Sequence, residues 1–149
     1  MEKSVYIIKP EAVAHREQIR ALIRGAGLRV ANHKLAVFPE HALEALYPDM
    51  QENLHAATLH YFGIGPSEIG IVEGENAINR LSQLAGEDVN PAKCAPGTIR
   101  EQYGFKNPVK WRNAIYFLNG LHRSKNTTEV ERDLELFSSL ADEVGAQRA

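Results

Sequence analysis

Three features are scarce in this sequence of 149 residues, and each scarcity excludes a class of structure. Cys94 is the only cysteine, so no internal disulfide can form, which fits a reducing compartment. No apolar run approaches the ~20 residues of a transmembrane helix, and residues 1–5 do not begin a secretory signal. The net charge is only -2, so bulk electrostatics favour neither nucleic acid nor a membrane as a partner. We therefore expect a cytoplasmic protein that binds any anionic ligand through a local cationic site.

The remaining composition is that of a globular domain. Hydrophobic residues make up 44% of the chain, which is enough to build a core, and charged residues make up 24%, which is ordinary for a soluble protein. The length suits one domain, and no internal repeat or low-complexity segment divides it. The sequence therefore predicts a single domain over residues 1–149.

Short apolar runs predict four strands. Residues 4–8 are rich in β-branched and aromatic side chains, and Pro10 ends the run because proline cannot continue a central strand. Residues 28–38 and 68–73 predict the second and third strands. The apolar run 114–118 predicts a buried fourth strand.

Apolar residues at helical spacing predict the helices. The expected helices cover residues 11–24, 41–47, 49–62, 76–84 and 129–140. Pro48 separates the second helix from the third, so these two form a helical hairpin that is either a mobile flap over a site or a static pair. The order β-α-β-αα-β-α-β-α predicts an α/β (α+β) domain of the ferredoxin-like βαββαβ plan. This plan is a four-stranded antiparallel sheet with helices on one face, here with an extra helical hairpin.

Residues 119–124 place a histidine among donors and positive charges. His122 follows the predicted fourth strand and precedes the predicted last helix, so we expect it at a rim and not in the core. Arg123, Ser124 and Lys125 supply two cations and a hydroxyl beside it. An imidazole in this setting can accept a phosphoryl group, because nearby donors and cations stabilise the oxygens of the group in transfer. On this segment alone, the alternative is a surface histidine in a polar turn.

Four separated segments, in this order and on this fold plan, resemble the nucleoside diphosphate kinase family. They are residues 6–13, 90–92, 96–100 and 119–124, which read Tyr-Ile-Ile-Lys-Pro-Glu-Ala-Val, Asn-Pro-Ala, Pro-Gly-Thr-Ile-Arg and Asn-Gly-Leu-His-Arg-Ser. The first and third segments are specific, and the fourth keeps the spacing Asn-x-x-His-x-Ser. The resemblance extends over nearly the whole chain and implies a phosphotransferase that acts on nucleoside di- and triphosphates.

In the chemistry of that family, His122 would be the nucleophile. It would take the γ-phosphoryl group of a nucleoside triphosphate and pass it to a nucleoside diphosphate, in a ping-pong exchange through phosphohistidine. A neutral imidazole suits this role, because a reference pKa of ~6.5 leaves a lone pair free at neutral pH. The resemblance places Asp133 where the family has a glutamate that holds the other ring nitrogen. Glu129, one helical turn earlier, is the alternative.

The resemblance also implies a set of nucleotide-binding residues. Lys9 would contact the phosphates and the ribose hydroxyl, and Asn119 would bind the same hydroxyl. Arg100 would neutralise phosphate oxygens, which its fork of donors suits. Tyr47, in the flap, would close on the terminal phosphate. The family's base-stacking phenylalanine is either replaced by Leu54 or lost. Mg2+ would bridge the phosphates with few or no protein ligands, so no protein metal site is expected.

Several positions depart from the family pattern. The family's second phosphate-binding arginine falls at Ser82. Arg80 is a poor substitute, because two residues along a helix differ in direction by ~200°. We expect Arg123 to replace the missing arginine. The threonine usual before Asn-Pro becomes Asp88 or Val89, depending on where a one-residue insertion is placed.

Two further hypotheses stand beside the active phosphotransferase. One is a catalytically weakened nucleotide-binding or regulatory relative of the family. The other, a nucleic-acid-binding module, has little support: Trp111 lies among cations in the unusually long segment 101–118, but the aromatics form no stacking pair on a sheet face. The loop 86–97 resembles the family's subunit-contact loop, so we expect a homo-oligomer.

Overall fold

The N-terminal strand lies inside the sheet, with a neighbouring strand on each side. In the computed structural model, which describes residues 1–142, the sheet has four strands in the order β2-β3-β1-β6. The strands are β1 (Glu2–Ile8), β2 (Arg29–Ala36), β3 (Ser67–Gly74) and β6 (Leu121–Arg123). All neighbouring pairs are antiparallel, and Ile7 of β1 lies opposite both Ile69 and His122. The predicted four-stranded antiparallel sheet is confirmed.

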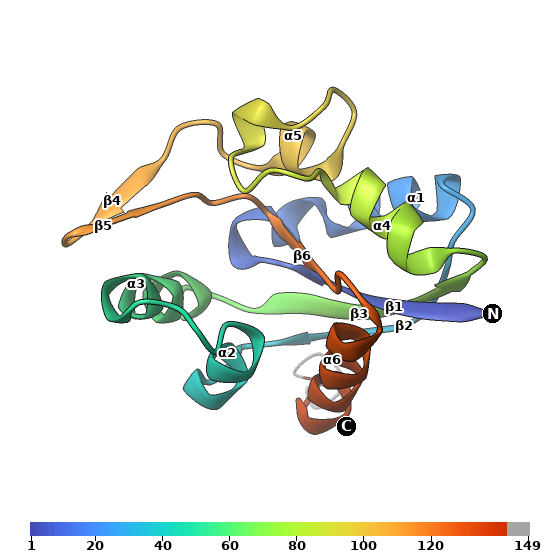
Figure 1. Cartoon of the computed structure of the whole chain (residues 1–149), viewed down its shortest axis with the longest axis horizontal. Coiled ribbons are helices and arrows are strands. Elements are labelled where there is room, and N and C mark those ends of the chain that lie inside the picture. Colours follow the sequence, from blue (N-terminus) through green and yellow to red (C-terminus); the bar gives the residue numbers. More distant parts are fainter. Residues whose placement is uncertain (143–149) are drawn as a thin grey trace.

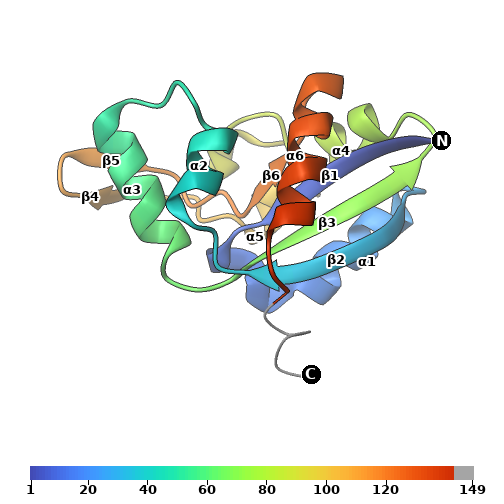
Figure 2. The same cartoon turned by 90° about the horizontal axis from the view of Figure 1, so that it is seen from below.

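Helices cover both faces of this sheet (Figures 1 and 2). The helices are α1 (Arg16–Gly25), α2 (Glu40–Leu46), α3 (Glu52–Phe62), α4 (Ala77–Ala85), α5 (Ile99–Tyr103) and α6 (Thr127–Ser139), with 3-10 helices at Pro10–His15 and Pro91–Lys93. None of the helices within the described residues is both long and apolar enough to span a membrane.

The alternation of side chains along β1 explains the two covered faces. Val5 and Ile7 belong to the core that packs against α2 and α6, whereas Tyr6 and Ile8 belong to the core beneath α1 and α4. Successive side chains of a strand point to opposite faces, and all four of these are fully buried. The expectation of helices on one face only is therefore wrong, because both sets of apolar side chains need cover.

The fourth strand of the sheet is not the predicted one. Ala114–Tyr116 forms β5, which pairs with β4 (Val109–Trp111) in a separate two-stranded hairpin. The place beside β1 is taken by β6, which contains His122. A short apolar run identifies a strand but not the strand with which it pairs. The strand itself was therefore predicted correctly, and its place in the four-stranded sheet was not.

Aromatic contacts attach this hairpin to α3. The rings of His60 and Trp111 stack at 4.7 Å between centroids, and those of Tyr61 and Tyr116 stack at 5.2 Å. At the turn, Arg112 has a φ of 53° and its guanidinium lies 4.3 Å from the centre of the Trp111 ring. An isolated two-stranded hairpin is marginally stable, so these contacts with α3 hold the segment in place.

Candidate active site

His122 lies within β6 and is only 8% exposed. The predicted rim position between a strand and a helix is wrong, because the strand beside β1 contains the histidine. Gly120 turns the chain into β6 with a φ of 83°, which non-glycine residues rarely adopt. Its N–H donates to Glu11 Oε2 at 2.9 Å, and its carbonyl accepts the Lys9 N–H at 2.9 Å. These bonds bring the end of β1 beside the start of β6.

Asp133 of α6 is fully buried beside the His122 ring. Its Oδ2 lies 3.3 Å from His122 Nε2 and accepts the Ser124 hydroxyl at 2.7 Å. Its Oδ1 accepts the Arg132 Nε–H at 2.9 Å. Because an ionised carboxylate only accepts hydrogen bonds, His122 Nε2 carries the proton in this contact and Nδ1 keeps its lone pair.

Burial and neighbouring charges set the protonation of this pair. Burial lowers the pKa of His122 below its ordinary value; Lys9 and Arg132 act in the same direction, while Asp133 opposes them. Burial alone would raise the pKa of Asp133, but the hydrogen bonds from His122, Arg132 and Ser124 reverse this and leave that pKa lowered. The stable state near neutral pH is therefore a neutral imidazole beside an ionised carboxylate.

A pocket of about 600 Å³ opens beside His122. The charged groups of its lining are mostly cations, which come from the end of β1, from α5, from β6 and from the segment after β6: Lys9, Arg100, Arg123 and Lys125. Its apolar lining comes mainly from the helical hairpin and the β-hairpin segment: Leu46, Met50, Leu54, Ile115 and Phe117. Figure 1 shows α3 and the β4–β5 hairpin together at one end of the molecule, away from the N-terminus. The arrangement suits a ligand that has an anionic group and a flat apolar group.

Lys9 is buried in the wall of the pocket and is 6% exposed. Its ammonium lies 5.8 Å from the centre of the Phe62 ring and 5.9 Å from that of the Tyr116 ring. Burial lowers the pKa of Lys9 to about 8, with Glu11 opposing the shift and Arg100 adding to it. A buried ammonium without a close carboxylate partner gains the most from an anion that enters the pocket.

The two arginines of the pocket differ in how their guanidinium groups are used. Arg100 donates to three backbone carbonyls: from Nε and Nη2 to Leu121, and from Nη1 to Gly86 and Asp88, at 2.8–3.2 Å. Arg123 is 8% exposed, and its Nε has no hydrogen-bond partner among the described residues. Arg100 thus joins the loop after α4 to β6, whereas Arg123 keeps donor capacity for a ligand.

The other predicted site residues also line the pocket. The Tyr47 ring meets the His122 ring edge-on at 5.8 Å, and Leu54 lies on the same wall. Asn119 donates from Nδ2 to the Val89 carbonyl at 3.3 Å, while its buried Oδ1 has no partner within residues 1–142. The structure therefore brings together all eight residues that the sequence and the resemblance implied.

Glu129, the alternative partner for the imidazole, is used elsewhere. Its Oε1 accepts the backbone N–H of Lys125 at 3.0 Å. Glu129 lines the pocket, but the carboxylate in contact with the ring belongs to Asp133.

Arg132 and Tyr116 also lie next to site residues, and neither was predicted. The only sequence signal for Arg132 was its place beside Asp133. Tyr116 was missed because the 114–118 run was predicted to belong to the four-stranded sheet and not to a separate hairpin.

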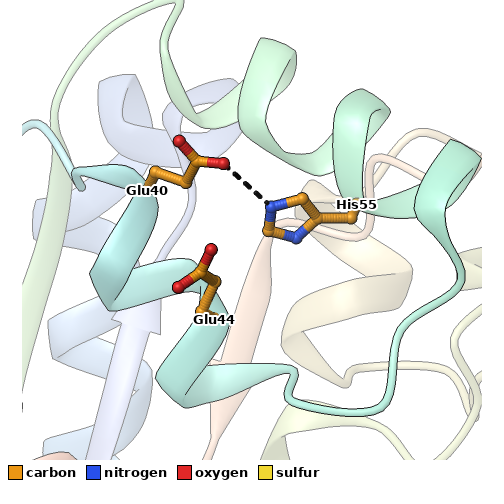
Figure 3. Close-up of side chains that lie close together, drawn as sticks. All are labelled: Glu40, Glu44 and His55. Atoms are coloured by element: carbon orange, nitrogen blue, oxygen red, sulfur yellow. Dashed lines mark hydrogen bonds and ion pairs between the residues drawn. The ribbon is translucent and has the colours of Figure 1, made fainter.

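Metal-ligating side chains gather outside the pocket. Glu40 and Glu44 of α2 and His55 of α3 place their ligand atoms within 4.8 Å of one another (Figure 3). His55 Nε2 lies 3.5 Å from Glu40 Oε1, which is an ordinary exposed ion-pair geometry when the histidine is protonated. None of the three lines the pocket, and exposed carboxylates are common without an ion. Within the described residues, the pocket itself holds no such group of ligands.

Comparison with known proteins assigns this geometry to a family. A sequence model described as nucleoside diphosphate kinase matches residues 2–142. The chain belongs to the nucleoside diphosphate kinase family. The nucleoside diphosphate kinase of Nitratidesulfovibrio vulgaris (strain DP4) is 38% identical over 69% of this chain and 76% of its own length. That of Chlamydia pneumoniae is 30% identical over 99% of this chain and 98% of its own.

A solved structure of the family shows the same fold. The nucleoside diphosphate kinase of Borrelia burgdorferi, a transition state mimic with bound vanadate and ADP, matches with a TM-score of 0.76 at 18% identity. The match covers 95% of this chain and 90% of that one. Family membership confirms the resemblance and makes the chain a phosphotransferase of the nucleoside diphosphate kinase type. The hypothesis of a weakened or regulatory relative is not favoured.

Proposed function

We propose that the chain moves the γ-phosphoryl group of a nucleoside triphosphate to a nucleoside diphosphate through a phosphohistidine at His122. The observation that carries this proposal is the His122–Asp133 contact, which leaves Nδ1 with a lone pair beside a pocket lined by cations. A neutral imidazole is required, and burial keeps the pKa of His122 low enough to provide it at neutral pH.

The proposed transfer consists of two displacements. The Nδ1 lone pair of His122 attacks the γ-phosphorus, an N–P bond forms, and the bond from that phosphorus to the β,γ-bridging oxygen breaks. The nucleoside diphosphate leaves with the electron pair of the broken bond. The ring gains positive charge, which the Nε2–H contact with Asp133 stabilises. In the second half, a terminal oxygen of another nucleoside diphosphate attacks the phosphorus, and the N–P bond breaks to restore the lone pair.

Arg123 is the proposed phosphate ligand in place of the arginine that the family pattern has lost at Ser82. Arg123 lines the pocket, its side chain is mostly buried, and its Nε has no hydrogen-bond partner among residues 1–142. Arg100 contributes positive charge nearby, although three carbonyls occupy most of its donors. Lys9 supplies a third cation, and its charge is favoured once an anion offsets the cost of burial.

The remaining residues are proposed to hold the nucleoside. The unpartnered Asn119 Oδ1 and the Lys9 ammonium are suited to the ribose hydroxyl, and Tyr47 to the terminal phosphate. Leu54, Met50 and Ile115 offer apolar side chains to the flat faces of a base. Apolar stacking does not read the polar edges of a base, so this end of the pocket is permissive.

Mg2+ is the proposed cofactor, carried by the phosphates of the nucleotide. The donor set of the pocket supports this form of binding: cations predominate, and its two carboxylates, Glu87 and Glu129, come from separate segments. When bound, the cation would neutralise charge on the phosphate oxygens. The residues of the chain would then hold the nucleotide and not the metal.

The protein is further proposed to be one cytoplasmic domain that forms a homo-oligomer. The family model over residues 2–142 supports a single domain, although residues 143–149 lie outside the described part of the chain. The lone Cys94 fits a reducing compartment. β2 is an edge strand of the sheet, a position at which a strand of another copy could pair. Light scattering coupled to gel filtration measures the mass; a monomer mass across micromolar concentrations would contradict the oligomer.

The central proposal is tested by incubation with labelled ATP and Mg2+. We expect an acid-labile, base-stable phosphoprotein that a nucleoside diphosphate discharges and that His122→Asn does not form. The matched control is His41→Asn, an exposed histidine on α2 outside the pocket, which should label like the wild type. Absence of label on the wild type, or label that persists in His122→Asn, would contradict the proposal.

A further inference from the structure

The carboxylate of Asp133 is held at both of its oxygens. Oδ2 receives His122 Nε2 and the Ser124 hydroxyl, and Oδ1 receives the Arg132 Nε–H at 2.9 Å. The carboxylate is fully buried, whereas the Arg132 side chain is 28% exposed and does not line the pocket. Arg132 therefore touches the carboxylate that meets the His122 ring but lies outside the lining of the pocket.

A carboxylate with only one oxygen engaged can rotate about its terminal bond, which is a soft torsion. Asp133 has a shorter side chain than the glutamate that the family pattern places here, so its reach to the ring leaves less tolerance. The contact with His122 is already long for a charged hydrogen bond, at 3.3 Å. If the carboxylate rotated away from the ring, the Nε2–H of His122 would lose its hydrogen-bond acceptor. The ring could then adopt the tautomer with its proton on Nδ1, and Nδ1 would have no free lone pair.

We propose that Arg132 is a positioning residue: its Nε–H fixes the Asp133 carboxylate and, through it, the orientation and tautomer of the His122 ring. The inference rests on the proposed function of His122. Its alternative is that Arg132 and Asp133 form an ordinary ion pair between neighbours on a helix, worth little to the protein. The two accounts differ in whether the hydrogen bond from Arg132 to Asp133 Oδ1 changes the reactivity of His122 Nδ1.

Two substitutions separate the hydrogen bond from the charge. Arg132→Gln keeps an N–H donor the same number of bonds from the backbone as Nε but removes the charge, and Arg132→Met removes both. Arg80→Gln on α4 is the charge-matched control, because Arg80 is exposed and outside the pocket. For each variant we would measure the single-turnover rate of phosphoenzyme formation, the KM for ATP, the thermal midpoint and the NMR titration of the His122 ring.

We expect Arg132→Met to slow phosphoenzyme formation about tenfold with little change in KM, because a misplaced nucleophile loses rate and not ground-state binding. Arg132→Gln should restore the rate to within about twofold of the wild type. The His122 titration should move upward in both variants, because the charged groups facing the ring are Lys9, Arg132 and Asp133 and one cation has been removed. Arg80→Gln should match the wild type in every measurement.

Three results would overturn the inference. They are an Arg132→Met rate equal to that of Arg80→Gln, an Arg132→Gln rate as slow as that of Arg132→Met, or a His122 titration unmoved by both variants. A variant that unfolds is identified by its thermal midpoint, and the Gln variant then carries the test. A wild-type protein that takes no label would contradict the proposed function instead, while the titration would still report whether Arg132 acts on the ring.

Discussion

The two ends of the pocket are built on different principles. Around His122, polar side chains from β6, from Ser124 just after it and from α6 hold one another by hydrogen bonds at 2.7–3.3 Å. At the far end, α3 and the β4–β5 hairpin meet through stacked aromatic rings, and Ile115 is 63% exposed. Transfer chemistry needs fixed atoms, whereas apolar contact with a base tolerates different side chains. The far end can therefore change its side chains more freely than the His122 end, where the hydrogen-bonded positions must be kept.

The sharpest test of the His122 end is Asp133→Asn. Ser124 and Arg132 both donate to the carboxylate, but only Ser124 can instead accept, so the amide nitrogen is forced toward Ser124 and His122 Nε2. The ring must then accept at Nε2 and carry its proton on Nδ1. We expect phosphoenzyme formation to fall about 10³-fold, by analogy with a carboxylate-to-amide change that imposes the wrong tautomer. A loss below about tenfold in stopped-flow transfer would show that the carboxylate does not set the tautomer.

The next effect concerns the cations. Arg123→Ala should weaken triphosphate binding by about 2 kcal/mol, or about 30-fold, because hydrogen bonds to charged groups are lost. Lys106→Ala is the control, since that exposed lysine pairs with Glu101 at 2.9 Å and lies outside the pocket. Isothermal titration with a non-hydrolysable triphosphate measures both. Equal affinities in the two variants would remove Arg123 from the phosphate site.

A smaller effect appears as a pH dependence. The Lys9 ammonium is charged below its pKa of about 8 and neutral above it, so its attraction for phosphate fades as pH rises through that value. The kcat/KM should therefore fall up to about tenfold per pH unit above pH 8, because this ratio reports groups of the free enzyme. Lys9→Arg remains charged and should lack this limb, even if its overall activity is lower. If the fall in kcat/KM above pH 8 persists unchanged in Lys9→Arg, it reports the titration of a group other than Lys9.

The smallest effect on chemistry is expected at the hairpin. Trp111→Ala removes the stack on His60 and should cost about 1 kcal/mol of stability, in the range of one aromatic pair. The rate of phosphoryl transfer should change less than about threefold, because no catalytic contact is lost. Phe105→Ala, at a half-exposed aromatic outside the paired residues of β4 and β5, is the control for urea unfolding. A large loss of transfer rate in Trp111→Ala would show that the two ends of the pocket depend on each other.

Prediction from the sequence succeeded where the pattern was local. The strands at β1 and β3 and the helical hairpin around Pro48 follow from side-chain spacing and from proline. The hairpin β4–β5 was missed because a short apolar run does not specify its partner. Arg132 was missed because a helix neighbour of Asp133 ordinarily points about 100° away, and only its length lets Nε return to the carboxylate.

The sequence alone determined which chemical groups are available: one histidine among cations, a lysine at a strand end, an arginine after Pro-Gly-Thr-Ile, and an aspartate on the last helix. Their order was enough to indicate the family. Tertiary structure decided how the groups are used. It occupied Arg100 with carbonyls, left Arg123 with donors to spare, and enclosed Asp133 between Arg132 and His122. Hydrogen-bond partners depend on distances between segments far apart in the chain, and those distances exist only after the sheet and helices have packed.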